Sequence, residues 1–298
     1  MKRFYYLLCT FFFCCLPFAL TSCSSDDDEE GGSAEGSATA GQVSTTDGET
    51  LYITQVGDNV FSYDDKGKIA ECKVYGSDVY NFSYNPFKIS RSYQGNGYTD
   101  NEEYTNISVN GKGAITSMKE YFDYTSSKNE DENESGNGNL TCSYDGSGHL
   151  VSMKVTGTST YKDDGKTVTE KSSLDYSFTW TDGKLMKIVC TSVEDGERDV
   201  ETVTFEYGDN AQRNVTKQWT DCFFGDCIEE MEWLFYLGYF GVAGDYHPTG
   251  ATQVDSDGTT ERFVYETGLN TNGSVNYTRY KYNSNYWNNK RQYSYQIR

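Results

Sequence analysis

A hairpin unit that recurs along the chain restricts the fold more than any other feature of this sequence. Residues 61–74 read aromatic, small polar, aromatic, then Asp-x-x-Gly, then a stretch in which apolar and polar residues alternate. The same order returns in residues 142–155 and, one residue shorter, in residues 178–188. Alternation with period two is typical of strands with one buried face, and Asp-x-x-Gly is typical of a turn whose glycine takes a positive φ. Each copy therefore predicts a β-hairpin.

Fainter copies of this unit extend the pattern over the rest of the body. They lie in residues 107–115, 205–210 and 263–265, and their uneven spacing argues against a solenoid or a propeller. The stretches between turn signals give on the order of fifteen strands of about 6–10 residues. Consecutive strands with short turns pair antiparallel, and twist and edge protection favour closure of a long sheet. We expect an all-β fold, a long antiparallel meander rolled into a barrel-like sheet.

Two segments depart from the hairpin pattern. Residues 228–237 have apolar side chains at positions 228, 231, 234 and 235, and Gly238 follows as a stop. This spacing predicts one short amphipathic helix that plugs or caps the rolled sheet, with Glu232 on its wet face. The polar stretch of residues 126–139 is expected to be an inserted, mobile loop.

The N-terminal segment has the composition of an export signal. Two basic residues precede the apolar run of residues 4–16, which is too short for a comfortable membrane span. Residues 31–48 are rich in Gly, Ser, Ala and Thr and predict a flexible coil. We therefore divide the chain into a signal peptide (1–22), an acidic Gly/Ser-rich tether (23–48) and a single hairpin-repeat domain (49–298).

The charge of the chain excludes one class of partner. Without the signal peptide, 23 basic residues stand against 45 acidic ones, so the net charge is about −22. Such a chain repels the phosphates of nucleic acids, and we expect no nucleic-acid partner.

Five cysteines remain after the signal peptide and Cys23. Cys222 and Cys227 are the natural disulfide candidates in an oxidising compartment, because only four residues separate them. A metal site is the weaker reading, since no histidine lies near and the spacing differs from that of zinc sites. Cys72, Cys142 and Cys190 fall at apolar strand positions, where cysteine behaves as a small hydrophobic residue.

The sequence contains little material for catalysis. The motifs of serine hydrolases, zinc peptidases and nucleotide-binding loops are absent, and we expect neither a metal nor a cofactor. His149 stands in a turn and is expected to face solvent, whereas His247 precedes Pro248 in a Gly-rich loop. A glycosidase needs only two suitably spaced carboxylates, and acidic residues are plentiful. The sequence favours a non-enzymatic role without excluding a hydrolase.

Aromatic residues near the C-terminus are the best indication of a binding surface. Tyr280, Tyr282, Tyr286 and Trp287 lie among asparagines. Flat rings beside amide donors and acceptors suit sugar recognition, but alternating tyrosines are equally what a barrel wall requires. Both interpretations remain open.

The residues at the end of the export signal resemble the lipobox of bacterial lipoproteins. Leu20 and two small residues precede Cys23, and this resemblance implies that Cys23 is the lipid-bearing N-terminus of the mature protein. Several acyl chains together anchor a protein firmly. Ser24 is not the aspartate of an inner-membrane retention signal. The acidic residues 26–30 resemble a signal for export to the cell surface, although a solvated spacer has the same composition.

The body resembles an uncharacterised family of exported Gram-negative lipoproteins. The resemblance rests on the hairpin repeats followed by Leu-Gly-Tyr-Phe-Gly at 237–241 and His-Pro-Thr-Gly at 247–250, and it covers the chain from Leu51 onward. Members are described as domains of unknown function with a porin-like, barrel-type fold. The resemblance implies a fold and supplies no activity.

These observations favour an outer-membrane surface lipoprotein that acts as a binding or scaffold module. Its expected partners are the membrane, through the lipid on Cys23, and a glycan or an outer-membrane protein. The alternatives are a glycan-acting hydrolase with paired carboxylates and a carrier of an apolar ligand, with its cavity under the helix at 228–237. A packed interior favours the scaffold, a cleft with two close acids favours the hydrolase, and an empty apolar lumen favours the carrier.

Overall fold

The computed structural model describes residues 40–128, 132–163, 165–194, 196–224, 228, 231–283 and 286–298. Within these residues the chain forms seventeen strands and one short α-helix. The strands are β1 (Gln42–Ser44), β2 (Thr50–Val56), β3 (Asn59–Tyr63), β4 (Ile69–Val74), β5 (Asp78–Tyr84), β6 (Phe87–Gly95), β7 (Tyr98–Val109), β8 (Ile115–Ser126), β9 (Glu134–Tyr144), β10 (Leu150–Asp163), β11 (Lys166–Thr181), β12 (Lys184–Glu194), β13 (Glu197–Glu206), β14 (Gly250–Val254), β15 (Thr260–Leu269), β16 (Val275–Tyr282) and β17 (Arg291–Ile297).

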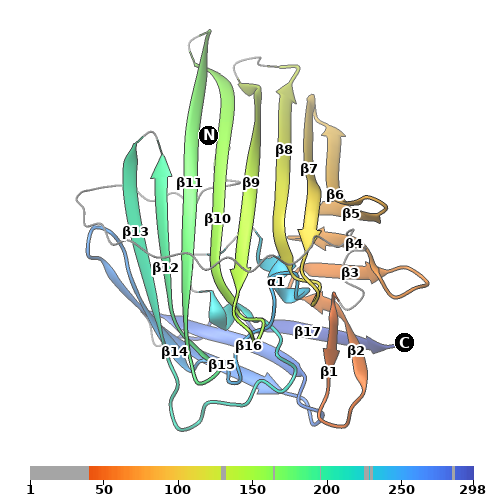
Figure 1. The fold of residues 1–298 in the computed structure, drawn as a ribbon, viewed down its shortest axis with the longest axis vertical. Coiled ribbons are helices and arrows are strands. Elements are labelled where there is room, and N and C mark those ends of the chain that lie inside the picture. The colour runs from red at the N-terminus through yellow and green to blue at the C-terminus, as the bar shows by residue number, and fades with distance from the viewer. Residues whose placement is uncertain are drawn as a thin grey trace.

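Sixteen of the strands, β2 to β17, form a closed antiparallel barrel (Figure 1). Each strand pairs with the next along the chain, and β17 closes the ring by pairing with β2, where Tyr295 stands opposite Ile53. Closure leaves no exposed sheet edge in the ring, which removes a route to aggregation. The predicted all-β meander and its barrel-like closure are confirmed.

The turns of the hairpin unit share one hydrogen-bond pattern. Asp64 Oδ1 accepts bonds from the backbone N–H groups of Lys66 and Lys68, each at 2.9 Å, and Asp145 makes the same two bonds in its own copy at 2.9 Å. Gly67 supplies the positive φ of +77° that the turn requires. The Asp-x-x-Gly signal therefore acts through local turn chemistry, as predicted.

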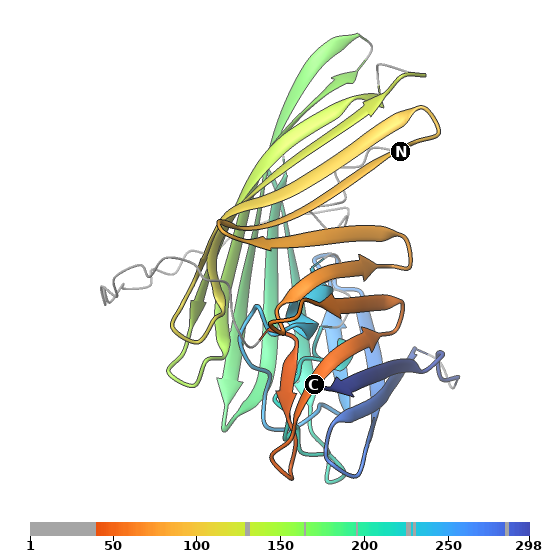
Figure 2. The same cartoon turned by 90° about the vertical axis from the view of Figure 1, so that its right-hand side faces the viewer.

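One side of the barrel is taller than the other. Strands β7 to β11 have 11–16 residues, whereas β2 to β5 have 5–7, and Figure 2 shows the long yellow and green strands rising beyond the short orange ones. The loop expected at residues 126–139 is shorter than predicted, because Ser126 ends β8 and residues 134–139 begin β9. Residues 129–131 lie outside the described part of the chain. Residues 134–139 pair with β8 on one side and β10 on the other. Backbone hydrogen bonds on both edges, rather than apolar side chains, stabilise this polar strand.

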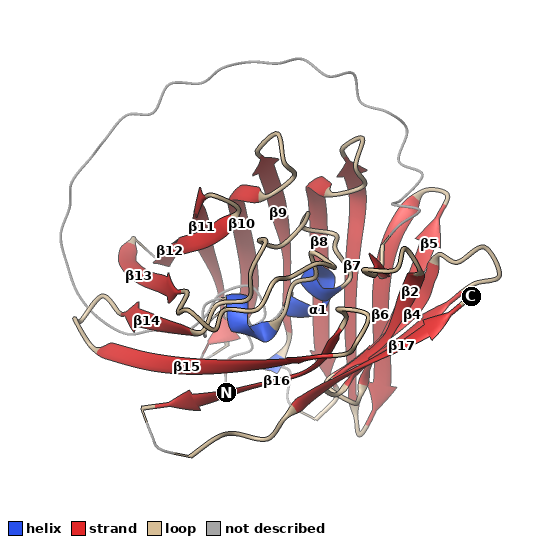
Figure 3. Ribbon diagram, turned by 90° about the horizontal axis from the view of Figure 1, so that it is seen from below, coloured by secondary structure: helices blue, strands red, loops and turns tan. Residues whose placement is uncertain are grey.

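The chain between β13 and β14 enters the ring and fills its base (Figure 3). We call the described part of residues 207–249 the plug. It carries a 3-10 turn, η3 (Asp221–Phe223), and the helix α1 (Glu232–Tyr236). The predicted helix is confirmed in type and place, although it spans only five residues. Twelve hydrophobic plug side chains are at most 1% exposed: Trp219, Cys222, Phe223, Phe224, Trp233, Leu234, Phe235, Tyr236, Leu237, Tyr239, Phe240 and Ala243.

Glu232 does not lie on a wet helix face, so that expectation is wrong. It is 8% exposed, and Arg291 of β17 donates to both of its carboxylate oxygens at 2.9 and 3.1 Å. The whole of α1 is buried within the ring, and therefore the helix has no solvent side. A buried carboxylate of this kind requires a partner, which β17 supplies.

Strand β1 joins the plug to the barrel wall. The composition predicts a coil as far as residue 48, but residues 42–44 pair with β2, where Val43 stands opposite Leu51. The N–H group of Gly41 donates to the carbonyl oxygen of Leu237 at 2.8 Å, and Ala40 and Val43 are buried. These long-range contacts stabilise a segment whose composition alone does not predict a strand.

The two faces of the barrel wall differ in polarity. Along β10 the buried side chains of Met153 and Val155 alternate with Lys154 and Thr156. The outward residues that are exposed on β8 to β11 include Lys119, Asp123, Thr141, Ser143, Lys154, Thr169, Lys171, Ser177 and Thr179. Buried Cys72 and Cys190 and half-buried Cys142 occupy the inward positions predicted for them. In the described chain, no helix has the length and apolarity needed to cross a membrane.

Candidate functional site

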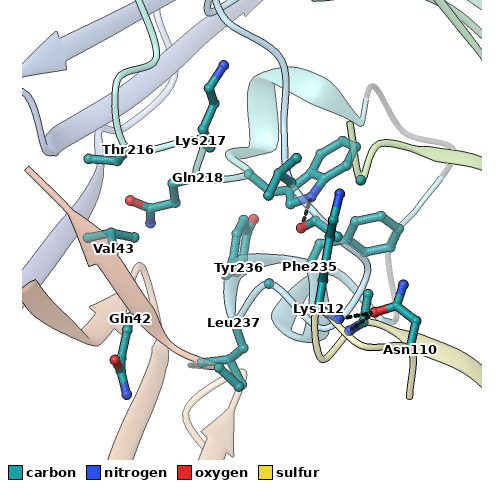
Figure 4. A pocket seen from close by; sticks show the side chains of 17 residues that line it. Gln42, Val43, Asn110, Lys112, Thr216, Lys217, Gln218, Phe235, Tyr236 and Leu237 are labelled. Atoms are coloured by element: carbon teal, nitrogen blue, oxygen red, sulfur yellow. Dashed lines mark hydrogen bonds between the residues drawn. The ribbon is translucent and has the colours of Figure 1, made fainter. Parts of the chain in front are cut away.

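A small cavity lies where the plug meets β1 and the turns at one end of the barrel (Figure 4). Its volume is about 150 Å³. Residues 216–219 and 235–238 of the plug form one side, and Gln42 and Val43 of β1 form another. The turn that joins β7 to β8 closes it through Asn110 and Lys112. Segments that are far apart in the sequence thus build this site together.

Aromatic rings form the apolar part of the cavity. Trp219 and Phe235 pack edge to face with ring centroids 5.1 Å apart. The indole N–H of Trp219 donates to the carbonyl oxygen of Gly241 at 3.0 Å, which holds this ring in place. Arg291 donates a hydrogen bond to the hydroxyl of Tyr236 at 2.6 Å, so Tyr236 contributes its ring, and not a free hydroxyl, to the cavity lining. Each of these rings is at most 1% exposed, so they form a rigid apolar wall behind the cavity rather than an open flat face.

Gln218 supplies the polar group that defines the chemistry of the cavity. Its side chain is 3% exposed, and its Oε1 accepts a hydrogen bond from the Tyr295 hydroxyl at 2.8 Å. Its Nε2 is buried and has no hydrogen-bond partner. A buried amide nitrogen without a partner is unusual in proteins, and it offers two donors. The cavity therefore suits a group that presents a hydrogen-bond acceptor.

Two lysines stand at the edge of the cavity, and both already have partners. Lys112 Nζ donates to the carbonyl oxygen of Gly146 at 2.9 Å. Lys217 forms an ion pair with Asp245. Desolvation, followed by the charge of Arg213, lowers the pKa of Lys217 from its ordinary value. Both lysines are therefore already engaged, whereas Gln218 Nε2 has no hydrogen-bond partner.

The carboxylates most closely grouped on the inner wall are bound by an arginine. Arg91 lies 3.2 Å from Asp100 and from Glu102 and 3.3 Å from Asp78. The hydroxyl of Tyr80 also donates to Glu102, at 2.8 Å. These contacts neutralise and orient the acids, which is a structural arrangement rather than the free acid–base pair of a glycosidase. Across the described residues, no group of three or more His, Cys, Asp or Glu side chains is placed to hold a metal ion.

The four aromatic residues singled out near the C-terminus do not form one surface. Tyr280 packs against Phe263 on the inner face of β16, and the hydroxyl of Tyr282 bonds to Glu261. Trp287 lies on the outer side of the same strand. The side chains of Arg279 and Lys281 stand 4.6 and 4.7 Å from the centroid of its ring. Tyr286 is 86% exposed.

The lipidation site and one of the disulfide candidates fall outside the described part of the chain. Cys23 and Cys227 are not among the described residues. Cys222 is 1% exposed, and its Sγ lies 3.9 Å from Thr267 Oγ1. Its pairing with Cys227 stays a prediction.

The two histidines are both buried. The solvent-facing position expected for His149 is wrong: the ring stacks on Trp180 with centroids 4.2 Å apart, and Nδ1 lies 2.9 Å from Asp145 Oδ2. His247 is 2% exposed, packs against Phe223, and has no hydrogen-bond partner at either ring nitrogen. Burial lowers the pKa of His247 to about 4.

The buried, uncharged His247 makes the barrel sensitive to acid. Burial holds its pKa in the folded protein below the ordinary histidine value of 6.5. The unfolded chain therefore binds a proton at a pH where the folded chain does not. We expect the free energy of unfolding to fall by up to about 3 kcal/mol between pH 6.5 and pH 4 from this residue. Urea unfolding of His247→Leu at several pH values should show a flatter profile over that interval, and a profile unchanged from the parent would contradict the assignment.

Sequence reasoning did not find the cavity. Gln218 follows Lys217, a non-glycine residue with a φ of +53°, and neither residue belongs to a motif. The only signal is the density of aromatic residues between 219 and 240, which predicts a buried segment without indicating which polar group it encloses.

Comparison with known proteins supports the fold and no activity. Neither a protein-family model nor a curated protein matches this chain. A porin-like protein from Bacteroides vulgatus ATCC 8482 superposes with a TM-score of 0.51 and 13% identity, covering 86% of this chain and 98% of that protein. A porin-like protein from Bacteroides uniformis ATCC 8492 gives a TM-score of 0.43 and 15% identity over 90% of this chain and 100% of its own. The first of these superpositions shows that the chain shares a porin-like barrel fold, as expected.

Proposed function

We propose that this chain is an outer-membrane lipoprotein, anchored through Cys23, whose barrel stands in water as a binding module. The observation that carries the proposal is the polarity of the barrel wall. The lipid-facing surface of a membrane-spanning barrel is an apolar band about 25 Å tall, and its interior is polar. Here most of the exposed, outward strand positions carry Ser, Thr, Asn, Lys or acidic residues. The buried inward positions are mainly apolar, with the charged cluster of Arg91, Asp100 and Glu102 among them.

The cost of placing this wall in a bilayer supports a water-facing barrel. An outward lysine such as Lys154 or Lys119 is unfavourable by about 2–4 kcal/mol at the bilayer midplane. The large apolar residues that are exposed, such as Val60, Tyr121 and Val264, lie on separate strands. Scattered apolar residues of this kind are normal on a water-facing surface. A lipid anchor then provides the membrane attachment that the wall does not.

The filled base of the barrel favours a binding module over a carrier. The plug occupies the region under α1 where a carrier would hold its ligand, and the cavity beside the plug measures about 150 Å³. A cavity of roughly that size accommodates benzene, which is far smaller than an acyl chain. The ligand therefore inserts a single small group.

The cavity suits one unit of a glycan. Gln218 Nε2 offers donors to a hydroxyl, carbonyl or ring oxygen, and the lining that includes Trp219 and Phe235 gives the cavity an apolar side. Exposed Tyr286 and its neighbour Trp287 are a proposed accessory contact for the same polymer.

The anchor is tested with the protein made in its native envelope. We expect the mature protein to begin at Cys23, to carry acyl chains and to fractionate with the outer membrane. Cys23→Ala should leave the membrane fraction and lose the added mass. Mass spectrometry of the intact protein is the measurement, and an unmodified parent chain with an uncut leader would contradict the proposal.

The cavity is tested by a glycan array with Gln218→Met. We expect the parent to bind a subset of glycans and the variant to bind them about tenfold more weakly, because a buried donor is lost. Tyr295→Phe is the matched control, since it removes the same internal hydrogen bond at 2.8 Å while keeping the Gln218 amide. Equal losses in both variants, or no glycan bound by the parent, would contradict this ligand class.

A further inference from the structure

A second, larger concavity lies at the turn end of the barrel wall, with a volume of about 890 Å³. We call it the lysine groove. Three neighbouring hairpins form it: the turn between β3 and β4 contributes Lys66 and Lys68, residues 84–88 join β5 to β6, and residues 105–107 belong to β7. The groove shares no lining residue with the cavity beside the plug. Its volume is typical of pockets that bind ligands.

The charge of the groove is opposite to that of the chain. The chain has a formal charge of −20, yet the only ionisable groups other than tyrosine that line the groove are Lys66, Lys68 and Lys88. Lys88 forms an ion pair with Glu103 at 2.6 Å. In the described part of the chain Lys66 and Lys68 form no ion pair, and Lys68 Nζ lies 4.8 Å from the centroid of the Tyr84 ring. Two ammonium groups therefore line the groove without an ion-pair partner among the described residues. Asp64 and Asp65 lie in the same turn, and the charge of Asp64 reaches Tyr84 in the groove.

The floor of the groove is rigid. The hydroxyl of Tyr84 donates to the carbonyl oxygen of Ile69 at 2.9 Å and lies 3.2 Å from the hydroxyl of Tyr239 in the plug. The rings of Tyr84 and Phe87 stack with centroids 5.2 Å apart. A preformed surface loses little entropy when a ligand binds.

Two exposed amides, Asn85 and Asn106, also line the groove. Asn106 has a φ of +50° and occupies the irregular part of β7, where the register with β8 shifts between Thr105 and Ser108. Asparagine tolerates this left-handed conformation, and the irregularity redirects its side chain relative to a regular strand. Asn85 lies in the opposite wall. No hydrogen bond engages either side chain within the described structure, so both amides are free to bind hydroxyl groups.

The surrounding strands do not suit an extended peptide. Strands β3 to β7 are each paired on both sides, so no edge near the groove can accept an added strand. We propose that the lysine groove binds an anionic polysaccharide: Lys66 and Lys68 contact its carboxylate or sulfate groups, and Asn85 and Asn106 contact its hydroxyls. This site is separate from the proposed glycan cavity, and each can fail without the other.

Binding of defined polymers to the full chain tests the groove. Dextran sulfate and polygalacturonate serve as sulfated and carboxylated probes, neutral dextran as the uncharged probe and poly-glutamate as the peptide probe. We expect at least one acidic polysaccharide to bind, with an affinity that falls as the salt concentration rises. Neutral dextran should not bind. Poly-glutamate binding as tightly as the acidic polysaccharides would overturn the assignment of a saccharide.

Variants locate the site. Lys66→Ser with Lys68→Ser should weaken binding about tenfold or more, because two charge-assisted contacts are lost. Lys119→Ser with Lys187→Ser changes the net charge equally at exposed positions outside the groove and should leave binding within about twofold. Equal losses in the two double variants would show that net charge alone attracts the polymer, which would overturn the site. Gln218→Met should have no effect on this binding.

Discussion

Replacing Arg291 with methionine should lower the free energy of unfolding by about 3–5 kcal/mol. Arg291 donates to Glu232 at 2.9 and 3.1 Å and to the Tyr236 hydroxyl at 2.6 Å, and its Nε lies 3.6 Å from Asp221. Without the guanidinium, the carboxylate of Glu232 stays inside the barrel with no cation to balance it. Urea unfolding followed by tryptophan fluorescence measures the change.

The effect of Arg291→Met should depend on pH. Burial raises the pKa of Glu232 above its usual value, and Arg291 opposes that shift. Removing Arg291 lets the pKa rise further, so the folded variant holds a proton that the unfolded chain releases. A raised pKa contributes stability at low pH that is lost as pH increases, and the deficit of the variant should therefore be larger at pH 8 than at pH 5.

Two companion variants separate this ion pair from ordinary surface charge. Adding Glu232→Gln to Arg291→Met should recover part of the loss, because no buried charge then remains. Arg279→Met breaks the exposed pair with Glu266, 2.8 Å long, and should change stability by less than about 1 kcal/mol. Similar losses for Arg279→Met and Arg291→Met would contradict the prediction that the ion pair between Arg291 of β17 and Glu232 of the plug is a major source of stability.

Trp219→Ala is the second substitution with a large expected effect, a loss of about 3–5 kcal/mol. The indole is 1% exposed and contacts the rings of Phe223, Phe224 and Phe235, with centroids 5.1–5.9 Å away. Truncation leaves a void at the centre of the plug and also removes the hydrogen bond to Gly241. Chemical denaturation monitored by circular dichroism measures the loss.

Trp287 provides the matched tryptophan for this test. It is half-buried and lies beneath Arg279 and Lys281 on the outer face of β16. Trp287→Ala removes cation–π contacts worth about 0.5–1 kcal/mol each at an exposed site, so its effect should be clearly smaller. Comparable losses for the two tryptophans would mean that the plug is not the principal core of the barrel.

Features that depend on neighbouring residues were predictable from the sequence. The turn at Asp64 and Gly67 follows from a side-chain acceptor and a residue that tolerates positive φ. The inward positions of Cys72 and Cys190 follow from period-two alternation. The short helix at 232–236 follows from its apolar spacing. Each is a property of a few consecutive residues.

Features that depend on partners far away in the chain were not predictable. Residues 134–139 look like a polar loop, but β8 and β10 supply backbone partners on both edges. Glu232 looks like a solvent-facing helix residue. It is buried because Arg291, 59 positions further along the chain, donates hydrogen bonds to its carboxylate. Gln218 belongs to no sequence motif. Its role at the cavity depends on Tyr295, whose hydroxyl donates to Gln218 Oε1 and leaves Nε2 without a partner.

The sequence by itself determined which segments form strands and turns and which strand positions face inward or outward. It also led us to expect an exported, lipid-bearing chain. The tertiary structure alone decided that the sheet closes through β17 and β2, that the plug fills its base, and that a small cavity and a lysine groove remain. The physical reason is the range of the interactions. Turn geometry and alternation act over a few residues, whereas closure, the pairing of buried charges and the shape of a cavity depend on which distant segments meet.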